Sequence, residues 1–311
     1  MNNRIVLLTD AVEGVFARAD PVELAGLGPL WAAQVERLGR LAAVELPLAT
    51  GGALRGLAAA DLPAPARIFV CGECGSTMDA ARWLCDEGLL GPWDSVLSPR
   101  QNAGRGQLRR PWDSPAGNLH ASLRWPGPPG ENFAAEAWDR LTPLAAGWML
   151  VRGLGAMGVA VEVKWPNDLL SQGRKMGGVL VEERRGTTVV GVGLNLSWAP
   201  PASRLRADHA VPAGTLAEAG AAIPPLGVWS RLVDQAQICY TKCLHSADSQ
   251  EFIDRFSRRM AWIGRTVTIR EGERPPYQAR LLGVAQDGGL RLARNEEETV
   301  LYSGSVSLPG H

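Results

Sequence analysis

The sequence has no excess charge of either sign and no long apolar run. Its 311 residues include 32 basic and 32 acidic residues, so the formal net charge is zero. Proteins that bind nucleic acid or an anionic membrane are usually basic, so any anion site in this chain has to be built locally. No stretch approaches the roughly 20 apolar residues that a membrane helix needs. Asp10 and Glu13 end the amino-terminal apolar run without a cleavage pattern, so we expect a cytoplasmic protein that binds no membrane.

Cysteine is also scarce. The chain has five cysteines, an odd number that favours reduced thiols over a disulfide framework. Two short-spaced pairs, Cys71 with Cys74 and Cys239 with Cys243, have the residue type for zinc or redox chemistry. The second spacing is loose for zinc and falls in a segment with helical periodicity. Apolar packing is therefore the better interpretation, and we predict no protein-bound metal.

Three regions follow one another along the chain. Residues 1–65 are rich in Ala, Leu and Gly and end in a proline-containing linker. Residues 66–258 alternate strand-like apolar runs with helical patterns, which indicates a mixed α/β domain. Residues 259–311 hold short apolar runs separated by turns, with a hairpin signal at "DGG", and fit a small β-barrel.

The segment "RQNAGRGQLRRPW", residues 100–112, concentrates positive charge without an acidic residue. Its arginines are Arg100, Arg105, Arg109 and Arg110. Gly104 and Gly106 flank one of them and would let backbone N–H groups approach a ligand closely, while guanidinium groups suit phosphate and carboxylate oxygens. Because like charges repel, we expect this loop to be mobile when empty and ordered over an anionic ligand. A solvated basic turn is the alternative.

Further candidates lie at predicted strand ends. Lys164 ends an apolar strand-like run, where it is well placed to meet a ligand. Gly191 and Gly193 alternate in "VVGVGLNLS", so one face of that strand lacks side chains, as a flat ligand lying against it would require. For the nearby Arg174 and Lys175, a solvated turn and a functional role are equally good explanations. Each segment alone has a packing or turn explanation, but the combination indicates a site.

Five segments together resemble those of the biotin–protein ligases (biotin–acetyl-CoA-carboxylase ligases). They are "GSTMDAA", "QNAGRGQLRRPWDSPAGNLHASLRW", "KWPNDLL", "RKMGGVLVE" and "GVGLNL". They occur in the family's order and at its approximate spacing, over about residues 67–308. The resemblance implies an α+β fold with a mixed, largely antiparallel sheet and flanking helices, as in class II aminoacyl-tRNA synthetase cores. A small carboxyl-terminal barrel of the Src-homology-3 kind would follow.

The resemblance also implies a two-step, ATP-dependent ligation. Biotin's carboxylate attacks the α-phosphate of ATP and forms biotinyl-5′-AMP and pyrophosphate. A lysine of the biotin carboxyl carrier domain of a carboxylase then takes the biotinyl group, and AMP leaves. Two anions have to meet in the first step, so cations and N–H dipoles are needed there. Mg²⁺ would neutralise the remaining phosphate charge.

Site residues follow from their positions in these motifs. The predicted catalytic residues are Lys164 and Arg105. The predicted biotin-binding residues are Ser76, Thr77, Met78, Gln101, Gly104, Arg105, Gly106, Gln107, Lys164, Gly191 and Gly193. The predicted ATP-binding residues are Arg110, Trp112, Asn118, Asn167 and Asn195.

Two positions depart from the family's pattern. Gln107 stands where an arginine that helps to retain the adenylate is common, and an amide supplies no positive charge. We expect Arg109 to compensate in part. Met78 stands where asparagine is usual, which removes a polar contact near biotin.

The role of residues 1–65 is a separate question. Family members that double as repressors begin with a winged helix-turn-helix, and this segment has a faint helix-then-wing pattern. It contains five Arg against seven Asp plus Glu, whereas phosphate binding needs a positive balance. This argues against DNA binding and favours a packing extension, with a degenerate winged helix as the alternative.

Two other functions stay open beside the ligase: a biotin-responsive DNA-binding repressor and a lipoate-type ligase of related fold. The sequence lacks a Walker-type "GxxxxGK" loop, so a P-loop ATPase is not a serious rival. The carrier protein and the oligomeric state, including a homodimer through a sheet edge, are not decided by the sequence.

Overall fold

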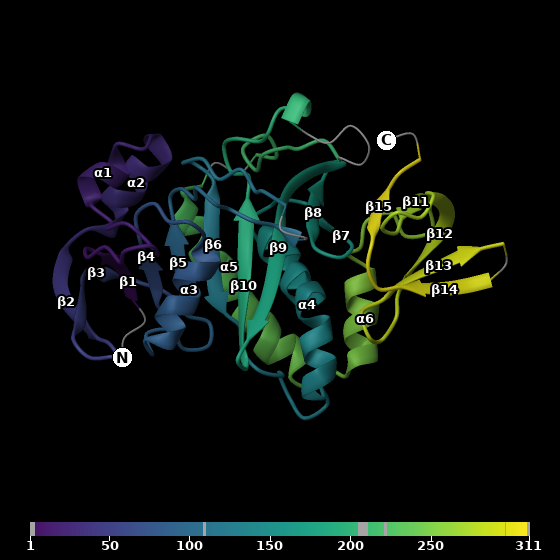
Figure 1. Cartoon of the computed structure of the whole chain (residues 1–311), viewed down its shortest axis with the longest axis horizontal. Helices are drawn as coiled ribbons and strands as arrows, with labels where there is room; N and C mark the ends of the chain where they lie inside the picture. Colours follow the sequence, from purple (N-terminus) through teal and green to yellow (C-terminus); the bar gives the residue numbers. More distant parts are fainter. Residues whose placement is uncertain (1–3, 108–109, 205–210, 221–222, 296, 310–311) are drawn as a thin grey trace.

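The computed structural model describes residues 4–107, 110–204, 211–220, 223–295 and 297–309, and its strands form two sheets (Figure 1). The order of the ten strands in the larger sheet is β2 (Leu41–Pro47), β3 (Ala53–Pro63), β1 (Arg4–Leu8), β4 (Ile68–Val70), β5 (Ser95–Ser98), β6 (Leu119–Arg124), β10 (Thr187–Leu194), β9 (Arg174–Arg184), β8 (Asp168–Ser171) and β7 (Glu162–Lys164). Neighbouring strands are antiparallel except in the pairs β1–β4 and β4–β5. The predicted mixed, largely antiparallel sheet is confirmed.

Helices cover both faces of this sheet. The helices are α1 (Pro21–Ala25), α2 (Pro29–Leu38), α3 (Thr77–Asp86), α4 (Ala135–Ala156), α5 (Pro225–Ile238) and α6 (Ser249–Ser257), with a 3₁₀ turn η2 (Ala202–Arg204) and a π-helical turn η3 (Cys239–Leu244). Successive strand residues point to opposite faces, so Ile68 and Val70 pack in the core with α4 and α5, and Phe69 packs with α3. No helix in the described part of the chain is long and apolar enough to span a bilayer.

The smaller sheet lies at the carboxyl end and is wholly antiparallel (Figure 1). Its strand order is β14 (Glu297–Leu301), β13 (Leu290–Arg294), β12 (Tyr277–Val284), β11 (Thr266–Arg270) and β15 (Ser305–Ser307). The two sheets meet beside β7, where the indole Nε1 of Trp165 donates to the Gly288 carbonyl at 3.1 Å. The small carboxyl-terminal β unit expected from the sequence is therefore present next to the larger sheet.

Residues 4–63 contribute β1, β2 and β3 to the larger sheet. β1 pairs with β3 on one side and with β4 on the other, so the sheet continues across residue 65. Helix α2 packs toward α5, where the Gly227 amide donates to the buried Gln34 side chain at 3.2 Å. Next to the site, the Ala17 amide donates to the Glu73 carbonyl at 2.8 Å. The proline-containing linker thus joins β3 to β4, which lie on either side of β1 in one sheet.

The cysteines have ordinary packing environments. Cys71, Cys74 and Cys239 are buried, and the Cys71 thiol donates to the Leu97 carbonyl at 3.7 Å. Among the described residues, no three His, Cys, Asp or Glu side chains are grouped closely enough to hold a metal ion.

Candidate active site

A cavity of about 420 Å³ lies between the larger sheet, the start of α3, residues 101–113 and the end of β15. Its wall includes every residue that the sequence assigned to the site except Gly104 and Asn118. Residues as distant in sequence as Ser76, Lys164 and Ser305 meet there. The segments singled out from the sequence therefore converge on one hollow of the size that small-molecule sites usually have.

Gly104 and Asn118 do not line the cavity, but both contact residues next to its wall. A Cβ atom at Gly104 would lie 2.5 Å from the Trp112 carbonyl oxygen, so glycine permits a close backbone approach there. The buried Asn118 Oδ1 accepts from the amides of Leu196, Ser197 and Trp198 at 3.0, 3.2 and 3.1 Å, and its Nδ2 donates to the Trp198 carbonyl at 2.8 Å. Its side chain thus anchors the turn after β10 and does not line the cavity, and its contact with ATP stays a prediction.

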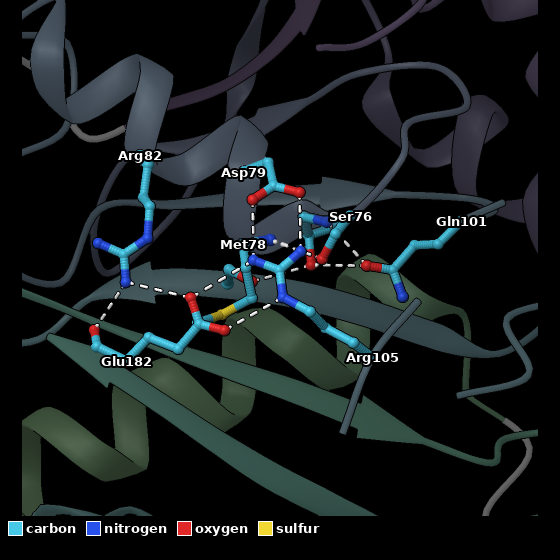
Figure 2. A network of polar contacts seen from close by, with 9 residues as sticks. Ser76, Met78, Asp79, Arg82, Gln101, Arg105 and Glu182 are labelled. Atoms are coloured by element: carbon cyan, nitrogen blue, oxygen red, sulfur yellow. Dashed lines mark hydrogen bonds and ion pairs between the residues drawn. The ribbon is translucent and has the colours of Figure 1, made fainter. Parts of the chain in front are cut away.

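Polar groups gather at the amino end of α3. Ser76 caps this helix by accepting from the Met78 amide at 3.3 Å. The Gln101 Oε1 accepts from the Thr77 amide and hydroxyl at 2.7 and 3.1 Å, and its Nε2 donates to the Ser114 hydroxyl at 2.8 Å. The Gln101 amide is thereby fixed in orientation near Ser76 (Figure 2), and Ser76, Thr77 and Gln101 all line the cavity.

The predicted bare face of β10 is occupied by side chains. A Cβ atom at Gly191 would lie 2.6 Å from the Met78 sulfur, and one at Gly193 would lie 2.6 Å from the Trp112 indole. These glycines therefore make room for Met78 and Trp112, and not directly for a flat ligand. The Trp112 Nε1 is buried and has no hydrogen-bond partner among the described residues. It is an unpaired donor on a residue that lines the cavity.

Arg105 meets two carboxylates that the sequence did not place near it. Its Nη1 and Nη2 donate to the two Asp79 oxygens at 2.7 and 2.8 Å. Its Nε donates to Glu182 Oε1 at 3.1 Å, and Nη2 also reaches Oε2 at 3.4 Å (Figure 2). Arg82 donates to the Glu182 carboxylate from the other side at 3.2 Å. Acids from α3 and β9 thus balance the charge of Arg105, one of the arginines whose repulsion was the ground for the predicted mobility.

These ion pairs favour the charged forms of Arg105 and Glu182. The bond to Asp79 raises the pKa of the Arg105 guanidinium. Burial alone would raise the pKa of Glu182, but Arg105 and Arg82 outweigh it, so that pKa is lowered.

A second charged cluster lies deeper in the cavity. Lys164, Lys175 and Lys242 are the chain's three lysines, and the first two share one carboxylate. Asp168 Oδ2 lies 2.9 Å from the Lys164 Nζ, and Oδ1 lies 2.5 Å from the Lys175 Nζ. Burial would raise the pKa of Asp168, but Lys175 and Lys164 outweigh it and hold that pKa far below its usual range. Two ammonium groups and one carboxylate give this cluster a formal net charge of plus one.

The remaining predicted residues differ in their environment. Lys175 also lies over the Trp112 ring, 5.4 Å from its centroid, whereas Arg174 points away and donates to the Ala213 carbonyl at 2.7 and 3.0 Å. Arg110 and Gln107 line the cavity. Arg109, which was expected to compensate for Gln107, lies outside the described residues.

Sequence reasoning missed three acidic residues of the site, namely Asp79, Glu182 and Asp168. All three stand inside the motifs quoted above. Their partners could not be read from the sequence, because Arg105 is 26 residues from Asp79 and 77 from Glu182. Asp168 had a weak local signal, since it follows Lys164 by four residues across a short hairpin.

Known proteins resemble this chain in sequence. The model of the biotin/lipoate A/B protein ligase family matches residues 94–198. A biotin–[acetyl-CoA-carboxylase] ligase of Paracoccus denitrificans is 32% identical over 203 residues, which are 63% of this chain and 78% of that protein. The chain belongs to the biotin/lipoate A/B protein ligase family. The bifunctional ligase/repressor BirA of Escherichia coli, 28% identical, aligns with 73% of this chain over 70% of its own length.

Solved structures of biotin protein ligases share the fold. A biotin protein ligase from Aquifex aeolicus in complex with biotin and ATP superposes with a TM-score of 0.61 at 23% identity, covering 77% of this chain and 97% of that one. A biotin protein ligase from Leishmania major in complex with biotin gives a TM-score of 0.53 at 23% identity, covering 76% of this chain and 98% of that one. At these identities the likeness establishes the architecture, and the residues of the cavity have to carry the chemistry.

Proposed function

We propose that this chain is an ATP-dependent biotin ligase that forms biotinyl-5′-AMP and transfers biotin to a lysine of a biotin carboxyl carrier domain. The observation that carries the proposal is the convergence of the motif residues on one cavity with a net positive charge at Lys164, Asp168 and Lys175. The names of the relatives support the same activity.

In this proposal the lysine cluster stabilises the charge that develops when carboxylate and α-phosphate combine. Asp168 holds the two ammonium groups on either side of one carboxylate, so they cost no reorganisation when the reacting oxygens arrive. Lys175 is the more exposed of the two, at 31% of its side-chain surface against 12% for Lys164. We assign both lysines to this role, although the sequence predicted only Lys164.

Binding of the two substrates is divided between the ends of the cavity. Ser76, Thr77 and Gln101 offer polar groups at the amino end of α3, which suits the ureido ring of biotin. Trp112 supplies an aromatic face and an unpaired indole donor, which suits the adenylate.

Mg²⁺ fits this cavity as part of the nucleotide substrate and not as a resident ion. Both oxygens of Asp168 already face ammonium groups. Mg²⁺ commonly binds through substrate phosphates and one or two carboxylates. We therefore infer that the substrate is the Mg²⁺ complex of ATP, with Lys164 and Lys175 contacting its phosphates.

A packing role for residues 1–65 is favoured over DNA binding. Three strands of this region extend the larger sheet, and the buried face of α2 packs toward α5. A helix that reads DNA needs an exposed, basic face.

The direct test is carrier biotinylation. The chain is incubated with biotin, MgATP and a biotin carboxyl carrier domain, and the carrier is weighed by mass spectrometry. The mass of one biotinyl group should be added at a single lysine, and excess lipoate should not compete. An unmodified carrier would contradict the proposal, and lipoylation would favour the lipoate-type alternative. Binding of DNA duplexes at low salt without carrier modification would favour the repressor.

A further inference from the structure

The Arg105 cluster differs from an anion site in its charge balance. Two guanidinium groups, Arg105 and Arg82, face two carboxylates, Asp79 and Glu182, so no net charge is left for a ligand. Arginine has five N–H donors. The carboxylates accept four hydrogen bonds from Arg105. A guanidinium engaged in this way is poorly available to a second anion.

The same side chain connects three separate parts of the fold. Arg105 itself lies in the segment of residues 101–114, whose described parts, 101–107 and 110–114, contribute one wall of the cavity. Asp79 lies in the first turn of α3, and Glu182 lies on β9. Figure 2 shows the Arg105 side chain passing between Asp79 and Glu182, with Arg82 on the far side of Glu182. The arginine therefore spans from the wall to a helix and to a strand.

Apart from Arg105, the segment is held by Trp112, which packs against Gly193 of β10, and at its base. Gln101 bonds Thr77 and Ser114 there, as described above. The two arms pair with each other, with the Trp112 amide donating to the Gly104 carbonyl and the Gly106 amide donating to the Arg110 carbonyl, both at 2.8 Å. Both ion pairs of Arg105 join the segment to other elements, to α3 through Asp79 and to β9 through Glu182. They therefore fix the position of the part of the segment around Arg105.

We propose that Asp79 and Glu182 are positioning residues for ligation: through Arg105 they latch residues 101–114 across the cavity in the empty protein. This role deepens the proposed function and rests on it. Arg105 would then act by holding the wall in its binding-competent place, while the lysine cluster meets the reacting anions. Preorganisation of this kind lowers the free-energy cost of binding.

The latch and a direct ligand contact predict opposite effects of Asp79→Asn. If Asp79 latches Arg105, its neutralisation frees the wall, and the KM for biotin rises about 5-fold with kcat within about 2-fold. If Arg105 instead binds a substrate anion, Asp79 competes with that anion, and its neutralisation lowers the KM. Glu182→Gln should act in the same direction as Asp79→Asn, and Asp79→Glu, which keeps the carboxylate, should retain most of the affinity.

A second readout needs no substrate and so separates the latch from the proposed function. Trypsin cleaves after arginine, and an arginine bound to two carboxylates is protected. In Asp79→Asn, cleavage of the Arg105–Gly106 bond in the empty protein should be about 5-fold faster than in wild type, as followed by mass spectrometry. If the chain catalysed no ligation at all, this difference would still be measurable.

Matched controls are available on the same elements. Asp86→Asn removes an exposed carboxylate two turns further along α3, and Glu183→Gln changes the neighbour of Glu182 on β9, whose carboxylate bonds only the nearby Gly186 amide at 2.7 Å among the described residues. Both should leave the KM and the cleavage rate unchanged. A lower KM in Asp79→Asn, a fall in kcat at unchanged KM, or cleavage at the wild-type rate would each overturn the latch.

Discussion

The two charged clusters of the cavity are built from similar parts and do different things. Around Arg105, two arginines face two carboxylates, and the Asp79 side chain is 54% exposed. Around Asp168, two lysines share one carboxylate that is only 15% exposed. The first cluster is neutral and joins three parts of the fold, whereas the second keeps one positive charge inside the cavity. Charge balance, more than the presence of a cation, therefore indicates where an anion binds.

Removing the surplus positive charge of the lysine cluster should have the largest effect on activity. In Lys175→Met or Lys164→Met, Asp168 balances the remaining lysine, so no net charge is left for the reacting anions. We expect kcat for biotinyl-5′-AMP formation to fall roughly 10³-fold, measured by exchange of labelled pyrophosphate into ATP. Lys242→Met, at an exposed position on η3, is the matched control and should retain full activity. Equal losses in all three variants would count against a special role of the lysine pair.

Removing the shared carboxylate tests the same cluster through stability. Asp168→Asn leaves two neighbouring ammonium groups without a counter-charge, and we expect a loss of about 3 kcal/mol in the free energy of unfolding at pH 7, measured with urea. The folded-state pKa of Asp168 is depressed, so its stabilisation is complete above its unfolded value of about 4 and is lost as the pH falls. The difference between wild type and variant should therefore shrink below pH 4, and a constant difference would contradict the assignment.

His120 is a buried titratable side chain that has no charged partner among the described residues, in contrast to Asp168. His120 lies opposite Gly193 in the sheet, its Nε2 donates to the Pro115 carbonyl at 3.2 Å, and burial lowers its pKa to about 4. Because the unfolded state binds the proton first, stability falls as the pH drops from about 6.5 to 4. Between pH 7 and pH 5, His120→Gln should lose about 2 kcal/mol less stability than wild type. Parallel pH profiles in urea unfolding would show that His120 is not responsible.

The sequence was most informative where a motif is local. Ser76, Thr77 and Gln101 could be predicted because each lies in a short recognisable segment, and Lys164 because it ends an apolar strand. The pairing of Arg105 with Glu182 could not, since it depends on how β9 is placed against the segment of residues 101–114. The glycines of β10 were predicted to leave a bare face for a flat ligand, whereas Met78 and Trp112 fill that space, and this filling depends on how α3 and Trp112 pack.

For the fold, too, local features could be predicted from the sequence and long-range strand pairing could not. The alternation of apolar runs with helical patterns predicted only a mixed α/β domain, and the largely antiparallel sheet with flanking helices followed from the family resemblance. The "DGG" turn predicted a hairpin in the small carboxyl-terminal β unit, where it joins β12 and β13. The joining of residues 4–63 to the larger sheet was not predicted. It rests on the pairing of β1 with β3 and β4, which are about 50 to 60 residues away in sequence, and no local pattern encodes such a register.

In the proposed division of labour, Arg105 positions the wall and the lysines stabilise the reacting anions. This division is tested most directly by measuring kcat and the KM for biotin of Arg105→Met and Lys175→Met side by side in biotinyl-5′-AMP formation. We expect Arg105→Met to raise the KM about 5-fold and to keep kcat within about 3-fold, whereas Lys175→Met should mainly lower kcat. A collapse of kcat in Arg105→Met as large as that in Lys175→Met would contradict it.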